Sequence, residues 1–131
     1  MLNDVRVLVV EDDPALLGSI ESALQERHRV TACRSPQSAL AMVEAGKHFD
    51  VLVCGYEMRE MNGRELRARL AERDPVLAHN SLLLGHGRLS IDDEELLEDA
   101  HARVLYHPLR SERLRDEVHA LAARAALAAG E

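Results

Sequence analysis

The sequence predicts an α/β protein in which helices cover both faces of a parallel sheet. Five short apolar runs alternate along the chain with five amphipathic segments, and each run is followed at once by polar or glycine-rich residues. Such short apolar runs are typical of strands that are buried on both faces. Strands that alternate with helices pair in parallel through right-handed crossovers, which gives a doubly wound sheet.

The first strand is predicted at residues 5–10, which are rich in valine. Asp13 suits the N-cap of the helix that follows, and Pro14 suits its first position. The helix has apolar residues at spacings of three and four, the signature of one buried face: Leu16, Leu17, Ile20 and Leu24.

The next two strands are predicted at residues 29–33 and 51–54. Ser35-Pro36 repeats the cap-and-proline signal, and Gly46 suits the C′ position that ends the second helix. Gly55 ends the third strand abruptly. A helix is then predicted at residues 63–73, with a break at Pro75.

The last two strands are predicted at residues 81–84 and 103–106. An acidic helix at residues 91–100 separates them, and Ser111 is predicted to cap a final helix whose inward residues are Leu114, Val118, Leu121 and Ala125. The chain is therefore expected to form one domain over residues 1–131. Its core would span about 5–121, and residues 122–131 would be an alanine-rich end that frays.

This order of elements fits a flavodoxin-like, doubly wound five-stranded sheet of strand order 2-1-3-4-5 with five helices. That order places Glu11 and Asp12 beside Gly55, at the carboxyl edge where ligands bind in such sheets. It also separates Cys33 from Cys54 by two strand spacings, about 10 Å. That distance is too long for a disulfide.

The composition excludes several classes of partner. A net charge of -7 argues against nucleic acid, since binding to its backbone needs clustered Lys and Arg. The chain shows neither an apolar run near 18 residues nor a secretory leader, so we expect no membrane association. Two cysteines do not form a disulfide framework, and a cytoplasmic location is predicted.

Three segments carry a resemblance to a known family: VLVVEDDPALL, FDVLV with EMNGREL, and the Tyr106-His107-Pro108 corner. Over nearly the whole chain they resemble the receiver domain of bacterial response regulators. In that family, an acidic pair after the first strand binds Mg²⁺, and an aspartate at the tip of the third strand accepts a phosphoryl group from a histidine kinase. A Thr or Ser ends the fourth strand, and a lysine precedes the proline after the fifth.

The resemblance places Glu11 and Asp12 on the acidic pair. It places Gly55 on the phosphoacceptor, Gly85 on the Thr/Ser position and His107 on the lysine position, while Val104 takes the place of the aromatic residue that switches with the Thr. Of these functional positions, only the acidic pair matches the family.

A shifted alignment does not restore the missing residues. Lys47 is the sole lysine and lies before the third strand, while Thr31, the sole threonine, lies within the second. Asp50 lies five residues before Gly55, roughly 16 Å along an extended strand. Phosphoryl transfer needs an in-line nucleophile, a metal and a cation. We therefore predict no acyl-phosphate chemistry and no enzyme activity.

The altered pocket leaves three interpretations open. Glu57, His86 and His107 could all approach the acidic pair, with the Glu57 carboxylate turned into the space at Gly55. In one interpretation the pair is a relic of the fold, and His107 bonds one of its carboxylates, which would raise the histidine pKa. In the others, Glu11 and Asp12 bind Mg²⁺ weakly, or the carboxylates and imidazoles bind a transition metal such as zinc.

The other singled-out side chains are expected to have structural or surface roles. Met58 and Met61 flank the loop after the third strand and are predicted to be structural. The remaining histidines are predicted to lie at the surface with no site role: His28, His48, His79, His101 and His119.

The acidic helix is either a solvated face or an interaction surface. In the resembled family, the fourth helix, fifth strand and fifth helix form the face that docks partners. The candidate contact residues here are acidic and would steer a basic protein: Asp92, Asp93, Glu95, Glu98 and Asp99. A second copy of the chain is a further candidate partner.

The sequence therefore predicts a pseudo-receiver that signals through phosphorylation-independent protein contacts. Two alternatives remain: a metal or small-ligand sensor that uses the Glu11/Asp12 pocket, and a receiver phosphorylated at a non-standard residue.

Overall fold

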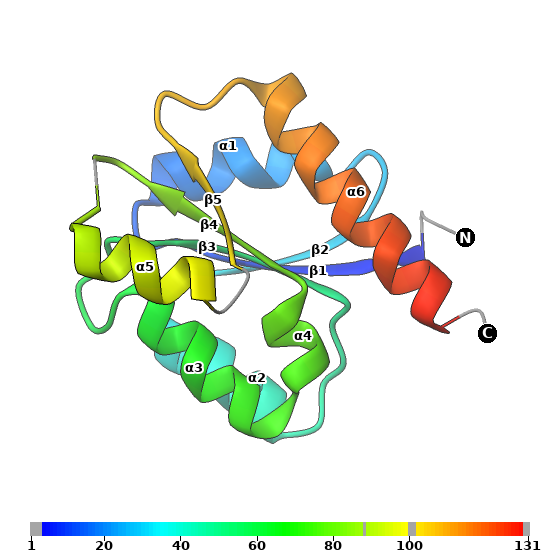
Figure 1. Cartoon of the computed structure of the whole chain (residues 1–131). Coiled ribbons are helices and arrows are strands. Elements are labelled where there is room, and N and C mark those ends of the chain that lie inside the picture. The colour runs from blue at the N-terminus through cyan, green and yellow to red at the C-terminus, as the bar shows by residue number, and fades with distance from the viewer. Residues whose placement is uncertain (1–3, 88, 100–101, 130–131) are drawn as a thin grey trace.

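The structure, a computed structural model, describes residues 4–87, 89–99 and 102–129. Five strands form one parallel sheet of order β2-β1-β3-β4-β5, as predicted. The strands are β1 Arg6–Val10, β2 Arg29–Cys33, β3 Val51–Gly55, β4 Ser81–Gly85 and β5 Arg103–Tyr106. The helices are α1 Pro14–Leu24, α2 Pro36–Glu44, α3 Gly63–Arg73, α4 Pro75–His79, α5 Ile91–Asp99 and α6 Ser111–Ala129 (Figure 1).

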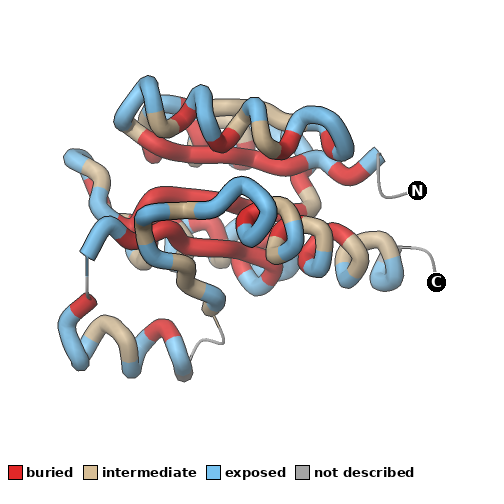
Figure 2. The backbone as a smooth tube through the Cα atoms, turned by 90° about the horizontal axis from the view of Figure 1, so that it is seen from above, coloured by how far each residue is buried: buried red, intermediate tan, exposed pale blue. Residues whose placement is uncertain are grey.

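The sheet separates two apolar cores because successive side chains of a strand point to opposite faces. In β1, Val7 and Val9 pack with α1 and α6, whereas Leu8 and Val10 pack on the other side with α2, α3, α4 and α5. Strands β3 and β4 are buried along their whole length, and the burial view shows this buried layer between the helices (Figure 2). The runs in the sequence are continuous rather than alternating because both faces are covered.

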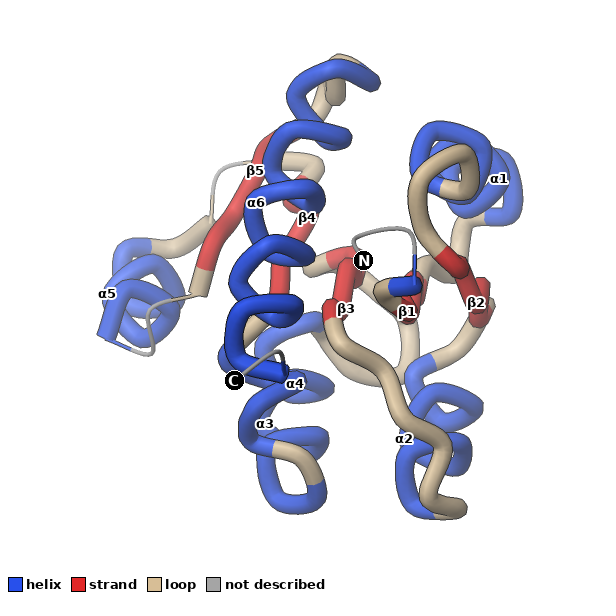
Figure 3. Tube along the Cα trace, turned by 90° about the vertical axis from the view of Figure 1, so that its right-hand side faces the viewer, coloured by secondary structure: helices blue, strands red, loops and turns tan. Residues whose placement is uncertain are grey.

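Strands β2 and β5 form the two edges of the sheet, and α5 lies beside the β5 edge (Figure 3). Both edge strands are less buried than the central ones. The parallel register brings Val10 beside both Cys33 and Cys54. Both thiols are free and buried, as their separation by β1 requires.

Two of the predicted helix starts are formed by the expected caps, Asp13 and Ser35. The Asp13 carboxylate accepts the N–H groups of Ala15 at 3.0 Å and Leu16 at 3.3 Å. The Ser35 hydroxyl oxygen accepts the N–H of Ser38 at 3.1 Å, and Gly46 follows α2 with φ of 93°. A positive φ of this size is readily adopted only by glycine, which confirms Gly46 as the C′ residue.

The predicted break at Pro75 is present, since α3 ends at Arg73, but the helices differ from expectation in three details. Pro75 does not only end a helix but begins a further short one, α4, because the Asp74 carboxylate caps it by accepting the Leu77 N–H at 3.0 Å. Ser111 is the first residue of α6 rather than its cap. Ala122 is fully buried and α6 continues through Ala129, so the core extends past residue 121.

None of the helices among the described residues is both long and apolar enough to cross a membrane.

Asn80 lies buried just before β4 and joins two distant parts of the chain. Its side-chain amide donates to the Asp50 carbonyl at 2.9 Å and to the Leu121 carbonyl at 3.0 Å. We expect Asn80→Ala to lower the free energy of unfolding by about 2 kcal/mol, because two buried hydrogen bonds are lost. Urea denaturation measures this change. Val76→Ala is the control, since Val76 is 68% exposed; an equal loss in both variants would contradict the role of the amide.

Candidate functional site

The acidic pair lies at the carboxyl end of β1, and its two members differ in environment. Glu11 is only 1% exposed, and its Oε2 accepts the N–H of Asp13 at 3.1 Å. Burial raises the pKa of Glu11, and the adjacent Asp12 charge raises it further, against the lowering effect of the Asp13 N–H. Asp12 is half-buried, and its Oδ2 accepts the N–H of Arg59 at 2.8 Å. Each carboxyl therefore already holds a backbone N–H.

Gly55, the last residue of β3, lies directly against the Glu11 carboxyl. A Cβ added at Gly55 would collide with Oε1 of Glu11 and would lie 3.2 Å from its Cδ. Oε1 is buried and has no hydrogen-bond partner among the described residues. The Glu11 carboxyl thus occupies the space that a side chain at position 55 would need.

Glu57 does not fill that space, contrary to expectation. Its side chain is exposed, and its Oε1 accepts the N–H of His86 at 3.0 Å. The contact ties the β3–α3 loop to the loop after β4. The Glu11 carboxyl occupies that space instead, because Glu11 follows the neighbouring strand β1 at the same level of the sheet.

His86 and His107 form a stacked pair at this edge. Their ring centroids lie 4.1 Å apart with an angle of 13° between the planes. Burial lowers the pKa of His107, and His86 lowers it further, whereas Glu57 acts in the opposite direction. The expectation that His107 bonds the acidic pair, with a raised pKa, was wrong: its Nε2 is buried and has no partner among the described residues.

Three observations bear on the metal sites expected at this edge. Among residues 4–87, 89–99 and 102–129, no three His, Cys, Asp or Glu side chains are grouped to hold an ion. Burial raises the pKa of Glu11, which makes less favourable the deprotonation that binding of Mg²⁺ requires. An imidazole binds zinc in the plane of its ring at about 2.0–2.1 Å. Because the His86 and His107 planes are stacked, one ion cannot lie in both.

Gly85, at the end of β4, is covered by the ring of Tyr106. A Cβ at Gly85 would lie 3.2 Å from Cδ1 and 3.3 Å from Cε1 of that ring. The Tyr106 hydroxyl donates to Glu94 of α5 at 3.1 Å. Val104, two residues earlier on the same face of β5, is half-buried in the core. The roles of Tyr106 and Glu94 were not predicted from the sequence. The alternation of side chains along β5 could have indicated Tyr106, because it puts this residue on the same face as Val104.

The predicted interaction face is only partly free. Asp92, Glu95 and Glu98 are exposed on α5. Asp93 instead pairs with Arg64 of α3 at 3.5 Å, so it holds α5 to the domain. The side chain of Asp99 lies outside the part of the chain that the structure describes.

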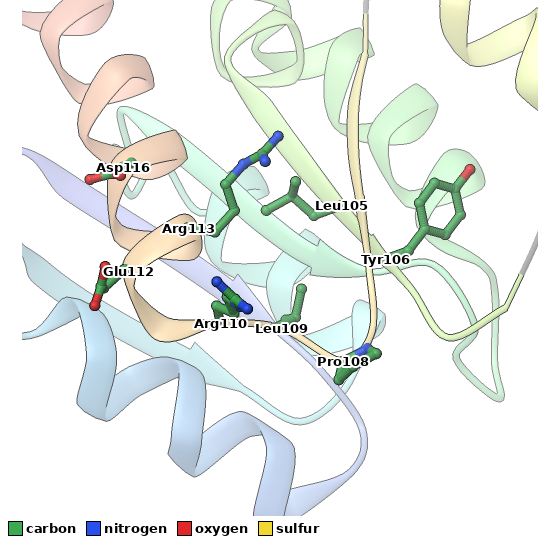
Figure 4. Close-up of a pocket in the computed structure, with 8 residues that line it drawn as sticks. All are labelled: Leu105, Tyr106, Pro108, Leu109, Arg110, Glu112, Arg113 and Asp116. Atoms are coloured by element: carbon green, nitrogen blue, oxygen red, sulfur yellow. The ribbon is translucent and has the colours of Figure 1, made fainter.

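A hollow of about 570 Å³ lies beside this face, along β5 and the start of α6 (Figure 4). Leu105 and Leu109 contribute apolar surface, and Arg110 and Arg113 contribute two cations. Arg113 pairs with Glu117 at 3.3 Å. Arg110 is exposed and forms no ion pair with any other described residue. The remaining lining residues are Tyr106, Pro108, Glu112 and Asp116.

The remaining predicted residues are placed as follows. Met61 is buried in the core and Met58 packs against it, as expected of structural residues. His48 and His79 are exposed and His119 is half-buried. His28 is buried, at 6% exposed, so its prediction as a surface residue was wrong. His101 lies outside the described residues.

Glu11→Gln should change how stability depends on pH. Because the folded state raises the pKa of Glu11, it binds this proton more tightly than the unfolded chain does. Wild-type stability therefore falls as pH rises from about 4.5 through the raised pKa, and the cost remains above it. The variant carries no such proton. Its stability relative to wild type should increase over this window, as measured by urea denaturation at a series of pH values. A difference that does not vary with pH would contradict a buried, titrating Glu11.

Comparisons with known proteins identify the family and support the fold. A family model, the response regulator receiver domain, matches residues 7–119. The chain is 38% identical over 65 residues to the two-component response regulator ARR2 of Arabidopsis thaliana; this match covers 48% of the chain and 10% of ARR2. The chain thus spans about a tenth of the length of this relative.

Two solved structures show the same fold over nearly the whole chain. A CheY-like receiver domain protein from Methanospirillum hungatei JF-1 superposes with a TM-score of 0.85 at 20% identity, covering 95% of this chain and 98% of that one. The BeF3-activated DrrB receiver domain superposes with a TM-score of 0.76 at 24% identity, covering 92% and 99%. Since the family match extends over most of the sheet and its helices, the chain belongs to the response regulator receiver domain family.

Proposed function

We propose that this receiver domain is a pseudo-receiver, which signals through protein contacts without phosphorylation of an aspartate and is not an enzyme. The observation that carries the proposal is the position of the Glu11 carboxyl, which fills the space beside Gly55. A phosphoryl group would need a carboxylate nucleophile at that point.

The other parts of the phosphorylation machinery are also replaced. His107 takes the position of the lysine, and its lowered pKa favours the neutral form, which cannot stabilise the developing negative charge. The Tyr106 ring covers Gly85, where the switching hydroxyl would stand. We therefore propose that Glu11 and Asp12 hold no resident Mg²⁺, and that the domain keeps one conformation unless a partner changes it.

We place the docking surface on α5, β5 and α6. It combines the exposed carboxylates of α5 with the free Arg110 and the apolar floor of the hollow. A partner with a basic segment would be steered to α5, since complementary charge speeds association. A second copy of the chain fits the same surface, because acidic and basic groups lie next to each other on it; sedimentation distinguishes a homodimer from a heterologous partner.

The absence of phosphoryl chemistry is tested with Mg²⁺ and beryllofluoride, a phosphoryl mimic. The melting temperature of the wild-type domain should not change with either or both, because a ligand raises it only by binding the folded state. Gly55→Asp/His107→Lys is the matched variant. Because a side chain at position 55 needs the space of the Glu11 carboxyl, the new carboxylate should displace Glu11, and a Mg²⁺-dependent shift with beryllofluoride should appear. A shift of the wild type would refute the proposal.

Phosphorylation at a non-standard residue is tested separately. After incubation with a small phosphoryl donor, mass spectrometry of the intact domain should show no added phosphate. A stable phosphate on any residue would favour that alternative. The metal-sensing alternative requires a zinc-dependent rise in melting temperature that His107→Ala abolishes, and the stacked imidazoles argue against it.

The docking surface is tested by reversing charge on α5. Partners isolated with the wild-type domain should associate about tenfold more slowly with Glu95→Lys/Glu98→Lys, and the difference should shrink at high salt. Glu44→Lys/Glu72→Lys makes the same charge change at exposed positions on α2 and α3. Equal slowing in both double variants would show a general effect of net charge and contradict docking at α5.

A further inference from the structure

A second polar cavity lies away from the carboxyl edge, between α1 and α6. It has a volume of about 340 Å³, within the usual range for small-ligand pockets. Its walls come from the end of α1, the turn that leads to β2 and the middle of α6. The lining residues are Ala23, Leu24, Glu26, Arg27, His28, Arg115, Asp116 and His119.

The topology places this cavity at the amino ends of the strands, whereas Gly55 lies at their carboxyl ends. Helix α1 starts at the carboxyl end of β1 and returns to the amino end of β2, which begins at Arg29. The turn is held by the His28 N–H, which donates to the Leu24 carbonyl at 3.1 Å. Figure 1 shows α1 and α6 on one face of the sheet, and the two helices are in contact. The cavity is therefore independent of the pocket around Glu11.

Three of the six polar side chains that line the cavity carry hydrogen-bond donors available to a ligand: Arg27, Arg115 and His119. Arg27 and Arg115 form no ion pair with any other described residue. Nδ1 of His119 is buried and has no hydrogen-bond partner among the described residues. A buried polar atom without a partner is costly, which points to a group that supplies one.

The donor set favours an oxyanion over a metal ion. A guanidinium fork matches the geometry of carboxylate and phosphate, and imidazole N–H groups add further donors. No grouping of three potential metal ligands occurs among the described residues, so Glu26, Asp116 and the histidines do not form an ion site. The two carboxylates belong to exposed residues.

We propose that the α1–α6 cavity binds a small molecule through its phosphate or carboxylate group, with Arg115, His119 and Arg27 as the contacting residues. Arg115 and His119 lie on one face of α6, four residues apart, and Arg27 lines the same cavity from the turn after α1. Such a ligand would bridge the two helices and stabilise their packing. This site does not depend on the pseudo-receiver proposal.

The test is a titration of the whole domain with inorganic phosphate and with citrate, at constant ionic strength so that general screening does not change. The imidazole NMR signals of His28 and His119 and the melting temperature are followed together. We expect saturable shifts of both signals and a rise in melting temperature with at least one of the two anions. A response to phosphate alone identifies a phosphate ligand, and a response to citrate alone a carboxylate ligand.

Two variants and a control make the test specific. Arg115→Gln and His119→Gln should each weaken binding about tenfold or more, since a charge-assisted hydrogen bond is lost. Arg110→Gln removes the same charge as the first variant at the hollow beside β5, and should leave binding unchanged. Absence of saturable shifts with both anions, or equal weakening by Arg110→Gln, would overturn the proposal.

Discussion

The contact between the Glu11 carboxyl and the backbone of Gly55 determines the carboxyl edge of this domain. Neighbouring parallel strands bring the two residues to the same level, and only glycine leaves room for the carboxyl. Once there, the carboxyl is buried, its pKa rises, and one oxygen has no described partner. A buried charge is costly in this setting, and burial shifts the carboxyl towards its neutral form. An acidic pair that could attract a cation has thereby become partly a packing element.

A second glycine at a strand end, Gly85 of β4, has its side-chain space occupied in a similar way. Gly85 leaves a space above β4, and the Tyr106 ring covers it from the edge strand. The Tyr106 hydroxyl then reaches Glu94, so the ring connects the end of β4 to α5. In both places, the space beside a glycine at a strand end is occupied by a side chain from the neighbouring strand or its end. The carboxyl edge is therefore closed by its own residues, and α5 is held by contacts that do not involve the acidic pair.

The sequence predicted those features that local rules control. Apolar runs located all five strands, and Asp13-Pro14 and Ser35-Pro36 located two helix starts, because caps and prolines act over one turn. Features that depend on side-chain direction were not predictable from the same rules. Glu57 turns to His86 because Glu11 fills the nearer space, and His28 is buried because α6 crosses the turn after α1. The position of a residue along the chain predicts which edge of the sheet its side chain is near. It does not predict which of several nearby side chains occupies a given space.

The charges on α5 show why an acidic run is not one uniform surface. Asp93 and Glu94 bond to Arg64 and Tyr106, and these contacts fix the helix against the domain. The exposed carboxylates next to them are left for solvent or a partner, and Arg110 adds a free cation across β5. Because internal bonds set the position of α5, the exposed charges form a prearranged pattern, which lowers the ordering cost of docking. The surface of α5 is thus held by arginine and tyrosine contacts that lie apart from the acidic pair at the carboxyl edge.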